Sequence, residues 1–181
     1  IYRNKAKLND DIYVTGNLGD SYLGLKALSN KAKFKNKDKL FFVDKYYKPD
    51  LPLNLTKYLL KFANSSIDVS DGLIDDLSKM INRQNLSFHL FEKKIPVSKK
   101  LSNFIKNKKL NKIDLISNGD DYQVLFTAGI NKARIIQNAS KTTGIKITKI
   151  GKIVSGKNRS LIFDQKDKQI QAKSKGYIHR F

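Results

Sequence analysis

Acidic residues beside a serine and a glycine mark the stretch from residue 67 to 76, which reads Ile-Asp-Val-Ser-Asp-Gly-Leu-Ile-Asp-Asp. Its apolar residues predict a short buried strand followed by a helix with one apolar face. Asp68, Ser70 and Asp71 would then lie where a strand ends and a helix begins, close to free backbone N–H groups. Carboxylates and a hydroxyl at such a point suit a Mg²⁺ ion bridged to phosphate oxygens. Taken alone, the same residues could equally be helix caps, which is their commoner use.

A second acidic group, Asp120 and Asp121, follows Ser117-Asn118-Gly119 and precedes a segment from 122 to 127 that predicts a strand. Acidic residues beside a glycine before a strand are commonly turn formers. On residue type alone, this group therefore supports either a site or a turn.

A glycine turn from Gly16 to Gly19 separates a predicted strand at 11–15 from a helix that begins near Asp20. Strand, glycine turn and helix is also the pattern of a phosphate-binding loop. The turn lacks the Gly-Lys-Ser/Thr ending of a P-loop and the third glycine of a dinucleotide-binding motif. A tight turn that requires glycine explains it at least as well.

The composition limits the chemistry that is available. The chain has 181 residues, 40% of them hydrophobic, which is enough for one folded domain with a core. It has no cysteine and only two histidines, His89 and His179, so any metal should be held mainly by oxygen ligands. It contains no signal peptide and no run of eighteen apolar residues, and we therefore expect a soluble, cytoplasmic protein without a membrane partner.

The net charge of +20 predicts attraction to polyanions. The lysines are spread along the whole chain, however, whereas a nucleic-acid-binding module would gather arginine and aromatic residues on one element. We therefore attribute the charge to compositional bias and do not expect nucleic acid as a partner. A basic nucleic-acid-binding domain is kept as an alternative of a different class.

The expected elements are interspersed strands and helices without strict alternation. This favours an α+β fold, a mixed β-sheet with helices packed on it, in a single domain over residues 1–181. Residues 31–39 should form a solvated helix end or loop, residues 46–49 a connection, and His89 should lie at the surface. Strands are expected at 11–15, near 68, and at 86–90, 122–127, 145–153 and 161–163, and helices from 20, from 49 to 64, at 73–81, around 101–105 and at 132–141.

Four stretches together resemble one family. In this order and spacing they are similar to the thiamine-monophosphate kinases, of the superfamily that includes aminoimidazole-ribonucleotide synthetase. The resemblance covers essentially the whole chain but only the C-terminal part of the family's proteins. It implies a fragment, a C-terminal aminoimidazole-ribonucleotide-synthetase-like domain without the N-terminal domain that carries much of the ATP and Mg²⁺ site and the dimer contact. The stretches are Arg3 to Gly19, Ser66-Ile67-Asp68-Val69-Ser70-Asp71-Gly72-Leu73, Asn118-Gly119-Asp120-Asp121-Tyr122 with Leu125-Phe126-Thr127, and Gly176-Tyr177-Ile178-His179.

The resemblance also implies roles for single residues. Asp68 and Asp71 match magnesium-binding aspartates, and Ser70 matches a serine that contacts the nucleotide. Arg3 matches an arginine that reaches the ATP phosphates, a role that its fixed charge and forked donors suit.

Two further matches concern the substrate. Asp120 stands where the family usually has a glutamate that binds the thiamine moiety, and it is one methylene shorter. Asn118 replaces the first glycine of that motif. Tyr177 matches a C-terminal aromatic residue that packs on the substrate ring.

The implied reaction transfers the γ-phosphate of ATP to thiamine monophosphate and gives thiamine diphosphate. ATP would be the co-substrate and several Mg²⁺ ions the cofactors, in a protein that forms a homodimer at full length. No acid or base is assigned, because phosphoryl transfer between two anions depends on charge neutralisation and alignment. The isolated chain should be inactive. The alternative within the superfamily is another ATP-dependent enzyme.

Overall fold

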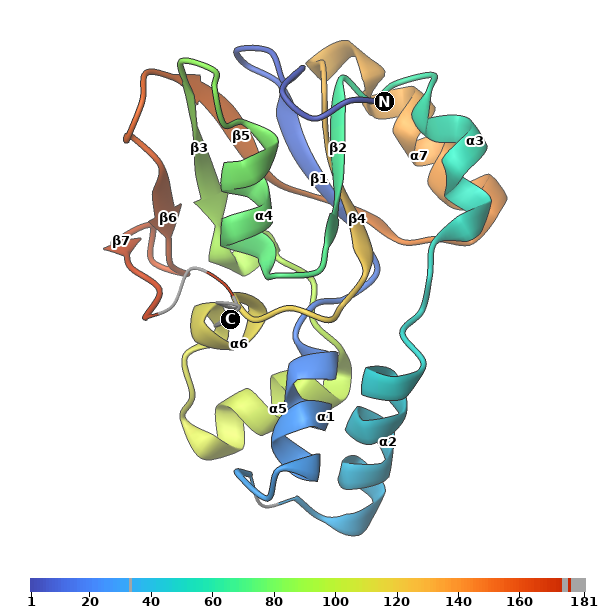
Figure 1. The fold of residues 1–181 in the computed structure, drawn as a ribbon, viewed down its shortest axis with the longest axis vertical. Coiled ribbons are helices and arrows are strands. Elements are labelled where there is room, and N and C mark those ends of the chain that lie inside the picture. Colours follow the sequence, from blue (N-terminus) through green and yellow to red (C-terminus); the bar gives the residue numbers. More distant parts are fainter. Residues whose placement is uncertain (33, 174–175, 177–181) are drawn as a thin grey trace.

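A seven-stranded mixed sheet forms the centre of the molecule (Figure 1), in the computed structural model that describes residues 1–32, 34–173 and 176. The strand order is β2-β4-β1-β5-β3-β6-β7, and neighbours are antiparallel except for the parallel pair β3 and β6. The predicted α+β class with a mixed sheet is therefore confirmed. The strands are β1 (Asp11–Thr15), β2 (Ser65–Val69), β3 (Leu86–Phe91), β4 (Gln123–Ala128), β5 (Ile147–Ser155), β6 (Leu161–Phe163) and β7 (Gln169–Ile170).

Helices cover both faces of the sheet because side chains alternate along its central strands. Ile12 and Val14 of β1 pack with helix α4 (Leu73–Met80) on one face. Tyr13 between them packs on the other face with helices α3 (Thr56–Leu59) and α7 (Ala133–Thr143). Each face thus has its own buried cluster, with α4 and α7 on opposite sides of β1 (Figure 1).

A group of helices lies beyond one end of the sheet (Figure 1). Its core is formed by Leu23, Phe42, Leu101 and Leu115. The helices are α1 (Asp20–Leu28), α2 (Asn36–Tyr47), α5 (Lys99–Lys108) and α6 (Lys112–Ile116). Short 3₁₀ turns, η1 (Leu53–Leu55), η2 (Glu92–Lys94) and η3 (Ile130–Lys132), complete the elements.

Two sequence predictions are corrected here. Tyr46 and Tyr47 were expected in a connection but form the last turn of α2, because Phe42 is fully buried and anchors one continuous helix on α1. A side chain at Gly24 of α1 would overlap the carbonyl of Phe42, so glycine permits this close approach. The helix expected from 49 to 64 is reduced to η1 and α3.

His89 is half-buried, and its ring stands edge-on to Phe163 with centroids 5.4 Å apart. No helix in the described part of the chain is long and apolar enough to cross a bilayer.

Candidate active site

The turn between β2 and α4 is held from inside by Asp76. The Oδ2 atom of Asp76 accepts hydrogen bonds from the backbone N–H groups of Ser70, Asp71 and Gly72, at 3.0, 2.9 and 3.0 Å. Asp76 is 1% exposed, and burial raises its pKa although the backbone bonds favour the carboxylate. These bonds satisfy donors that a helix N-terminus otherwise leaves without partners. The position of Asp71 is thereby fixed by a buried carboxylate one helical turn further along.

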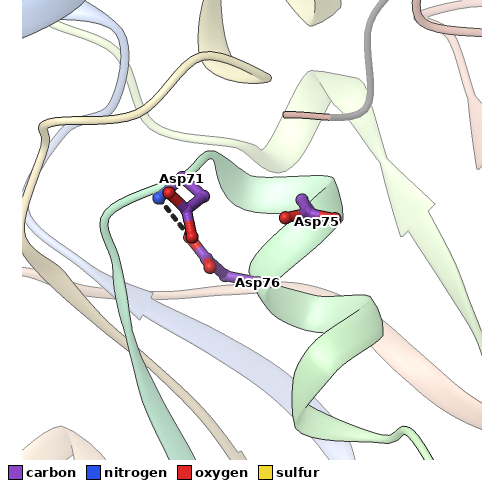
Figure 2. A group of neighbouring side chains, drawn as sticks. All are labelled: Asp71, Asp75 and Asp76. Atoms are coloured by element: carbon purple, nitrogen blue, oxygen red, sulfur yellow. Dashed lines mark hydrogen bonds between the residues drawn. The ribbon is translucent and has the colours of Figure 1, made fainter. Parts of the chain in front are cut away.

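Three carboxylates gather at the start of α4 (Figure 2). Asp71, Asp75 and Asp76 each offer an oxygen within 4.8 Å of the other two. The ammonium of Lys79 pairs with Asp71, with Asp75 at 2.6 Å and with Asp76 at 3.5 Å. Burial alone would lower the pKa of Lys79, but hydrogen bonds to Asp71 and Asp75 raise it above its usual value. On the side of the turn toward α4, the ammonium of Lys79 thus offsets part of the negative charge of these carboxylates.

The second acidic stretch is joined to the first by backbone hydrogen bonds. The N–H of Asp120 donates to the carbonyl of Ser70 at 2.9 Å, and the N–H of Tyr122 donates to the carbonyl of Val69 at 2.8 Å. A side chain at Gly119 would overlap the carbonyl of Ser70, and one at Gly72 would overlap the carbonyl of Ser117. Glycine is therefore needed at both points for the two loops to meet.

Tyr122 marks the side of the turn that faces β4. Burial raises the pKa of its phenol, and the nearby charges of Asp120, Asp68 and Asp71 raise it further. Tyr122 is 41% exposed, and Asp68 is an exposed residue on β2 opposite Val124. The charges of three residues that the sequence assigned to a site therefore all raise the pKa of one phenol.

The glycine turn is tied to this site by Asp121. The Oδ2 atom of Asp121 accepts the N–H of Gly19 at 2.7 Å, and burial raises the pKa of this carboxyl well above its usual range. The N–H of Gly16 donates to the carbonyl of Lys146, and that of Leu18 to the carbonyl of Pro96. Since these donors are already bonded within the protein, the tight-turn interpretation is favoured over a phosphate-binding loop.

Arg3 is not brought to this site. The N–H of Asn4 donates to the carbonyl of Met80 at the end of α4, and the hydroxyl of Ser65, at the start of β2, donates to the carbonyl of Tyr2. Exposed Arg3 therefore lies at the opposite end of β2 and α4 from Asp71 (Figure 1). Its role at ATP phosphates stays a prediction.

Gly176, the first residue of the predicted C-terminal motif, lies near the acidic cluster. A side chain at Gly176 would overlap Cβ of Asp75 and lie 3.1 Å from the carbonyl oxygen of Asp71. Tyr177, together with the rest of its predicted motif from 177 to 179, lies outside the described residues. Its predicted contact with the substrate ring stays a prediction.

Sequence reasoning missed four residues of this arrangement: Asp75, Asp76, Lys79 and Tyr122. The spacing of Asp75 and Lys79 by four residues is the usual signal for an ion pair on a helix. Acidic residues in the first turn of α4 could likewise have indicated contacts with its backbone N–H groups. Tyr122 carried no such signal, because its surroundings come from β2 and from α2.

The donor set fits a hard divalent cation. It consists of carboxylate oxygens, the ligands that Mg²⁺ prefers, at a turn where N–H groups could also meet phosphate. Asp76 already uses one oxygen for three backbone bonds, so Asp71 and Asp75 remain as the candidate ligands within this cluster. Asp68 is not a member of the cluster, and its role as a metal ligand stays a prediction.

Known proteins of similar sequence share one description. Thiamine-monophosphate kinase of Buchnera aphidicola subsp. Schizaphis graminum is 35% identical over 181 residues, which are 99% of this chain and 55% of that protein. The chain thus spans about half the length of the curated relatives it matches. No protein-family model matches it.

Solved structures agree with this result. The structure of thiamine-monophosphate kinase from Stenotrophomonas maltophilia K279a aligns with a TM-score of 0.78 and 26% identity, over 91% of this chain and 52% of that chain. The structure of AaThiL complexed with AMPPCP and TMP aligns with a TM-score of 0.76 and 27% identity, over 97% of this chain and 53% of that chain.

Proposed function

This chain is a relative of the thiamine-monophosphate kinases, and from that premise we propose that it forms part of an enzyme that transfers the γ-phosphate of ATP to thiamine monophosphate. The observation that carries the proposal is the meeting of the two acidic stretches, in which Asp120 bonds to the backbone of Ser70 beside Asp71. AaThiL, a similar structure, was solved with AMPPCP and TMP. ATP and thiamine monophosphate are therefore the ligands we propose for the complete protein.

The proposed reaction joins two phosphates, and both are anions. Catalysis must then neutralise charge and align the reacting atoms more than it must move protons. This agrees with a site to which Asp68, Asp71 and Asp120 contribute carboxylates.

We propose that Asp68 and Asp71 hold Mg²⁺. When bound, Mg²⁺ supplies positive charge that lets phosphate oxygens approach these carboxylates. Asp76 keeps Asp71 in place through the backbone of the turn. Lys79 balances the carboxylates on the α4 side. Ser70, at the same turn, is the proposed contact to the nucleotide.

Asp120 is the proposed contact to the thiamine moiety. Its φ of 68° is uncommon for a residue other than glycine. The bond from its N–H to Ser70 holds this conformation, so the orientation of its side chain is coupled to the turn that carries Asp71. The proposed substrate and metal contacts therefore lie on two loops that are hydrogen-bonded to each other.

Residues 1–181 are proposed to be a single domain of a longer cytoplasmic enzyme that acts as a homodimer. Two of the three clusters of buried residues contain side chains from one continuous sheet, which agrees with a single unit. The remaining half of the relatives' length would supply further contacts to ATP.

The experiment is a measurement of thiamine diphosphate formation from ATP and thiamine monophosphate by the complete protein. We expect Asp71→Asn to reduce Mg²⁺-dependent turnover by about 10²-fold or more, the loss that follows removal of a group that stabilises charge in the transition state. Asp167→Asn is the matched control, because Asp167 is exposed and pairs with Lys93. Unchanged turnover in Asp71→Asn would contradict the proposal.

A further inference from the structure

A cavity of about 690 Å³ opens on the side of the sheet that α4 covers. Its walls come from α4, β3, the loop that joins β5 to β6, and the strands β6 and β7. Voids inside a packed core are rarely larger than a water molecule, so a space of this size is not a packing defect. Its volume lies in the range of sites that bind small molecules.

The inner wall of this cavity is apolar. Ile74 of α4 and Ile81 at its end are buried, as are Phe88 of β3 and Ile162 of β6. All four belong to the cluster of buried residues on the α4 side of the sheet, and Ile170 of β7 packs against that cluster. Apolar groups gain free energy when they displace water from such a surface. The inner wall therefore favours the apolar body of a ligand.

The rim of the cavity carries positive charge. Arg83 and Lys157 are exposed residues of the lining, and neither forms an ion pair with any residue that the structure describes. Their segments lie side by side, because the N–H of Gly156 donates to the carbonyl of Asn85 at 3.0 Å. No carboxylate belongs to the lining formed by the described residues. An anionic group at the rim would thus meet two cations and no like charge.

The other polar groups of the lining are neutral. The hydroxyls of Ser78, Ser87 and Ser160 already form hydrogen bonds with backbone groups, and the amide of Gln84 donates to the carbonyl of Ala6. Side-chain amides make up the rest, and each can donate to an anionic oxygen or accept a ligand's N–H. These amides belong to Asn82, Asn158, Gln169 and Gln171.

The positive charge of the rim gains its meaning from the apolar wall beside it. Unpaired lysines alone would say little in a chain with a net charge of +20. Here the two features share one cavity, whose lining does not include Asp68, Asp71 or Asp120. The cavity is therefore separate from the proposed reaction site, although α4 contributes to both.

We propose that this cavity binds a small amphipathic anion, a molecule with a compact apolar body and one carboxylate, sulfonate or phosphate group. The apolar body lies against Ile81, Phe88 and Ile162, and the anionic group lies at the rim with Arg83 and Lys157. This inference does not depend on the proposed function, because none of the proposed reaction residues takes part in it.

The test uses two fluorescent probes that share an apolar body. Anilinonaphthalene sulfonate carries an anionic group, and phenylnaphthylamine lacks it. Both are titrated into the complete, folded protein, and we expect a saturable site for each. A variant with both Arg83→Gln and Lys157→Gln should bind the sulfonate about tenfold more weakly, the combined scale of two partly exposed ion pairs. Its affinity for the neutral probe should stay within about twofold of the wild type.

Two further variants sharpen the test. Gln171→Glu adds a negative charge at the exposed rim with little change in size, and it should weaken binding of the sulfonate alone by about threefold. Arg134→Gln is the matched control, because Arg134 is exposed on α7, on the opposite side of β1 from α4. It should bind both probes as the wild type does. Thermal unfolding checks that every variant is folded.

The outcomes separate this inference from the proposed function. Absence of a saturable sulfonate site on the wild type, or equal sulfonate affinity in the double variant and the wild type, would overturn the inference. Saturating thiamine monophosphate and a non-hydrolysable ATP analogue should leave the sulfonate bound. Its displacement would place the probe in the reaction site and would also overturn the inference. A protein that binds the sulfonate as expected but does not phosphorylate thiamine monophosphate would contradict only the proposed function.

Discussion

Aspartates lie on both sides of the turn at Asp71, but their surroundings differ. Toward α4, Asp75 and Asp76 meet the ammonium of Lys79 and backbone N–H groups. Toward β4, the charges of Asp68, Asp120 and Asp71 all raise the pKa of the phenol of Tyr122. A cation and N–H groups therefore stabilise carboxylates on the α4 side, whereas on the β4 side several negative charges act on one phenol.

The difference bears on the proposed metal site. A divalent ion at Asp68 and Asp71 would add positive charge on the β4 side, while on the α4 side it would compete with Lys79. Changes on the α4 side should therefore alter stability first, and changes on the β4 side should alter binding and turnover.

Gly119→Ala should have the largest effect on stability, because it separates the loop of Asp120 from the turn of Asp71. The added carbon overlaps the carbonyl of Ser70, and backbone must move. We expect a loss of about 3 kcal/mol in the free energy of unfolding, the upper part of the usual range for overpacking. Thermal and denaturant unfolding measure it. Gly129→Ala is the control, because the φ of Gly129 is −61° and the nearest neighbour of an added Cβ is a side-chain oxygen. Equal effects of the two changes would argue against the close contact between the loop of Asp120 and the turn of Asp71.

Asp76→Ala tests the α4 side. It removes the acceptor of three backbone N–H groups, and each unsatisfied buried donor costs about 1–3 kcal/mol. We expect a loss of about 3 kcal/mol, and a drop in Mn²⁺ affinity of about 10–100-fold because the turn no longer positions Asp71.

Asp76→Asn serves as the conservative control, since its amide oxygen can still accept these bonds. It should recover most of the stability. A stable Asp76→Ala protein with unchanged Mn²⁺ affinity would show that Asp76 does not position the turn.

Lys79→Met removes the cation on the α4 side and tests whether it competes with a divalent ion. Lys79 is partly exposed, so the free energy of unfolding should change by only about 1 kcal/mol or less. Divalent affinity, measured with Mn²⁺, should rise by about tenfold because three carboxylates lose their internal counter-ion. An unchanged or weaker affinity would mean that Lys79 does not compete with the metal.

The smallest expected effect is a change in the pKa of the Tyr122 phenol, which responds directly to the charges near it. Burial raises the pKa of its phenol first, and nearby carboxylates raise it further. Asp68→Asn should therefore lower this pKa, whereas Asp75→Asn should leave it unchanged. NMR of ¹³C-labelled tyrosine follows the titration. A change in the pKa of Tyr122 in Asp75→Asn but not in Asp68→Asn would contradict the assignment of Asp68 to the β4 side.

The sequence predicted the sheet strands and α4 well because their residues alternate or recur at helical spacing. Asp68, Asp71 and Asp120 are predicted as site residues from the sequence, and their roles stay predictions. That the two acidic stretches meet needed the structure, because Asp120 and Ser70 join through main-chain atoms that no side-chain pattern reveals.

The rest depended on tertiary contacts. The extent of α2 follows from the burial of Phe42 against α1, which local composition did not indicate. The surroundings of Asp20 likewise come from Ser98, which caps α5, and Lys45 on α2. Groups that meet only through folding gave no signal along the chain.

The most direct test of the difference between the two sides is the Mg²⁺ dependence of thiamine diphosphate formation in Asp68→Asn and Asp75→Asn of the complete protein. We predict that Asp68→Asn lowers turnover at a fixed Mg²⁺ concentration by about tenfold or more, the scale of a lost metal contact. Asp75→Asn should stay within about threefold of the wild type, because Asp75 pairs mainly with Lys79. Loss of turnover in Asp75→Asn with normal turnover in Asp68→Asn would contradict the account.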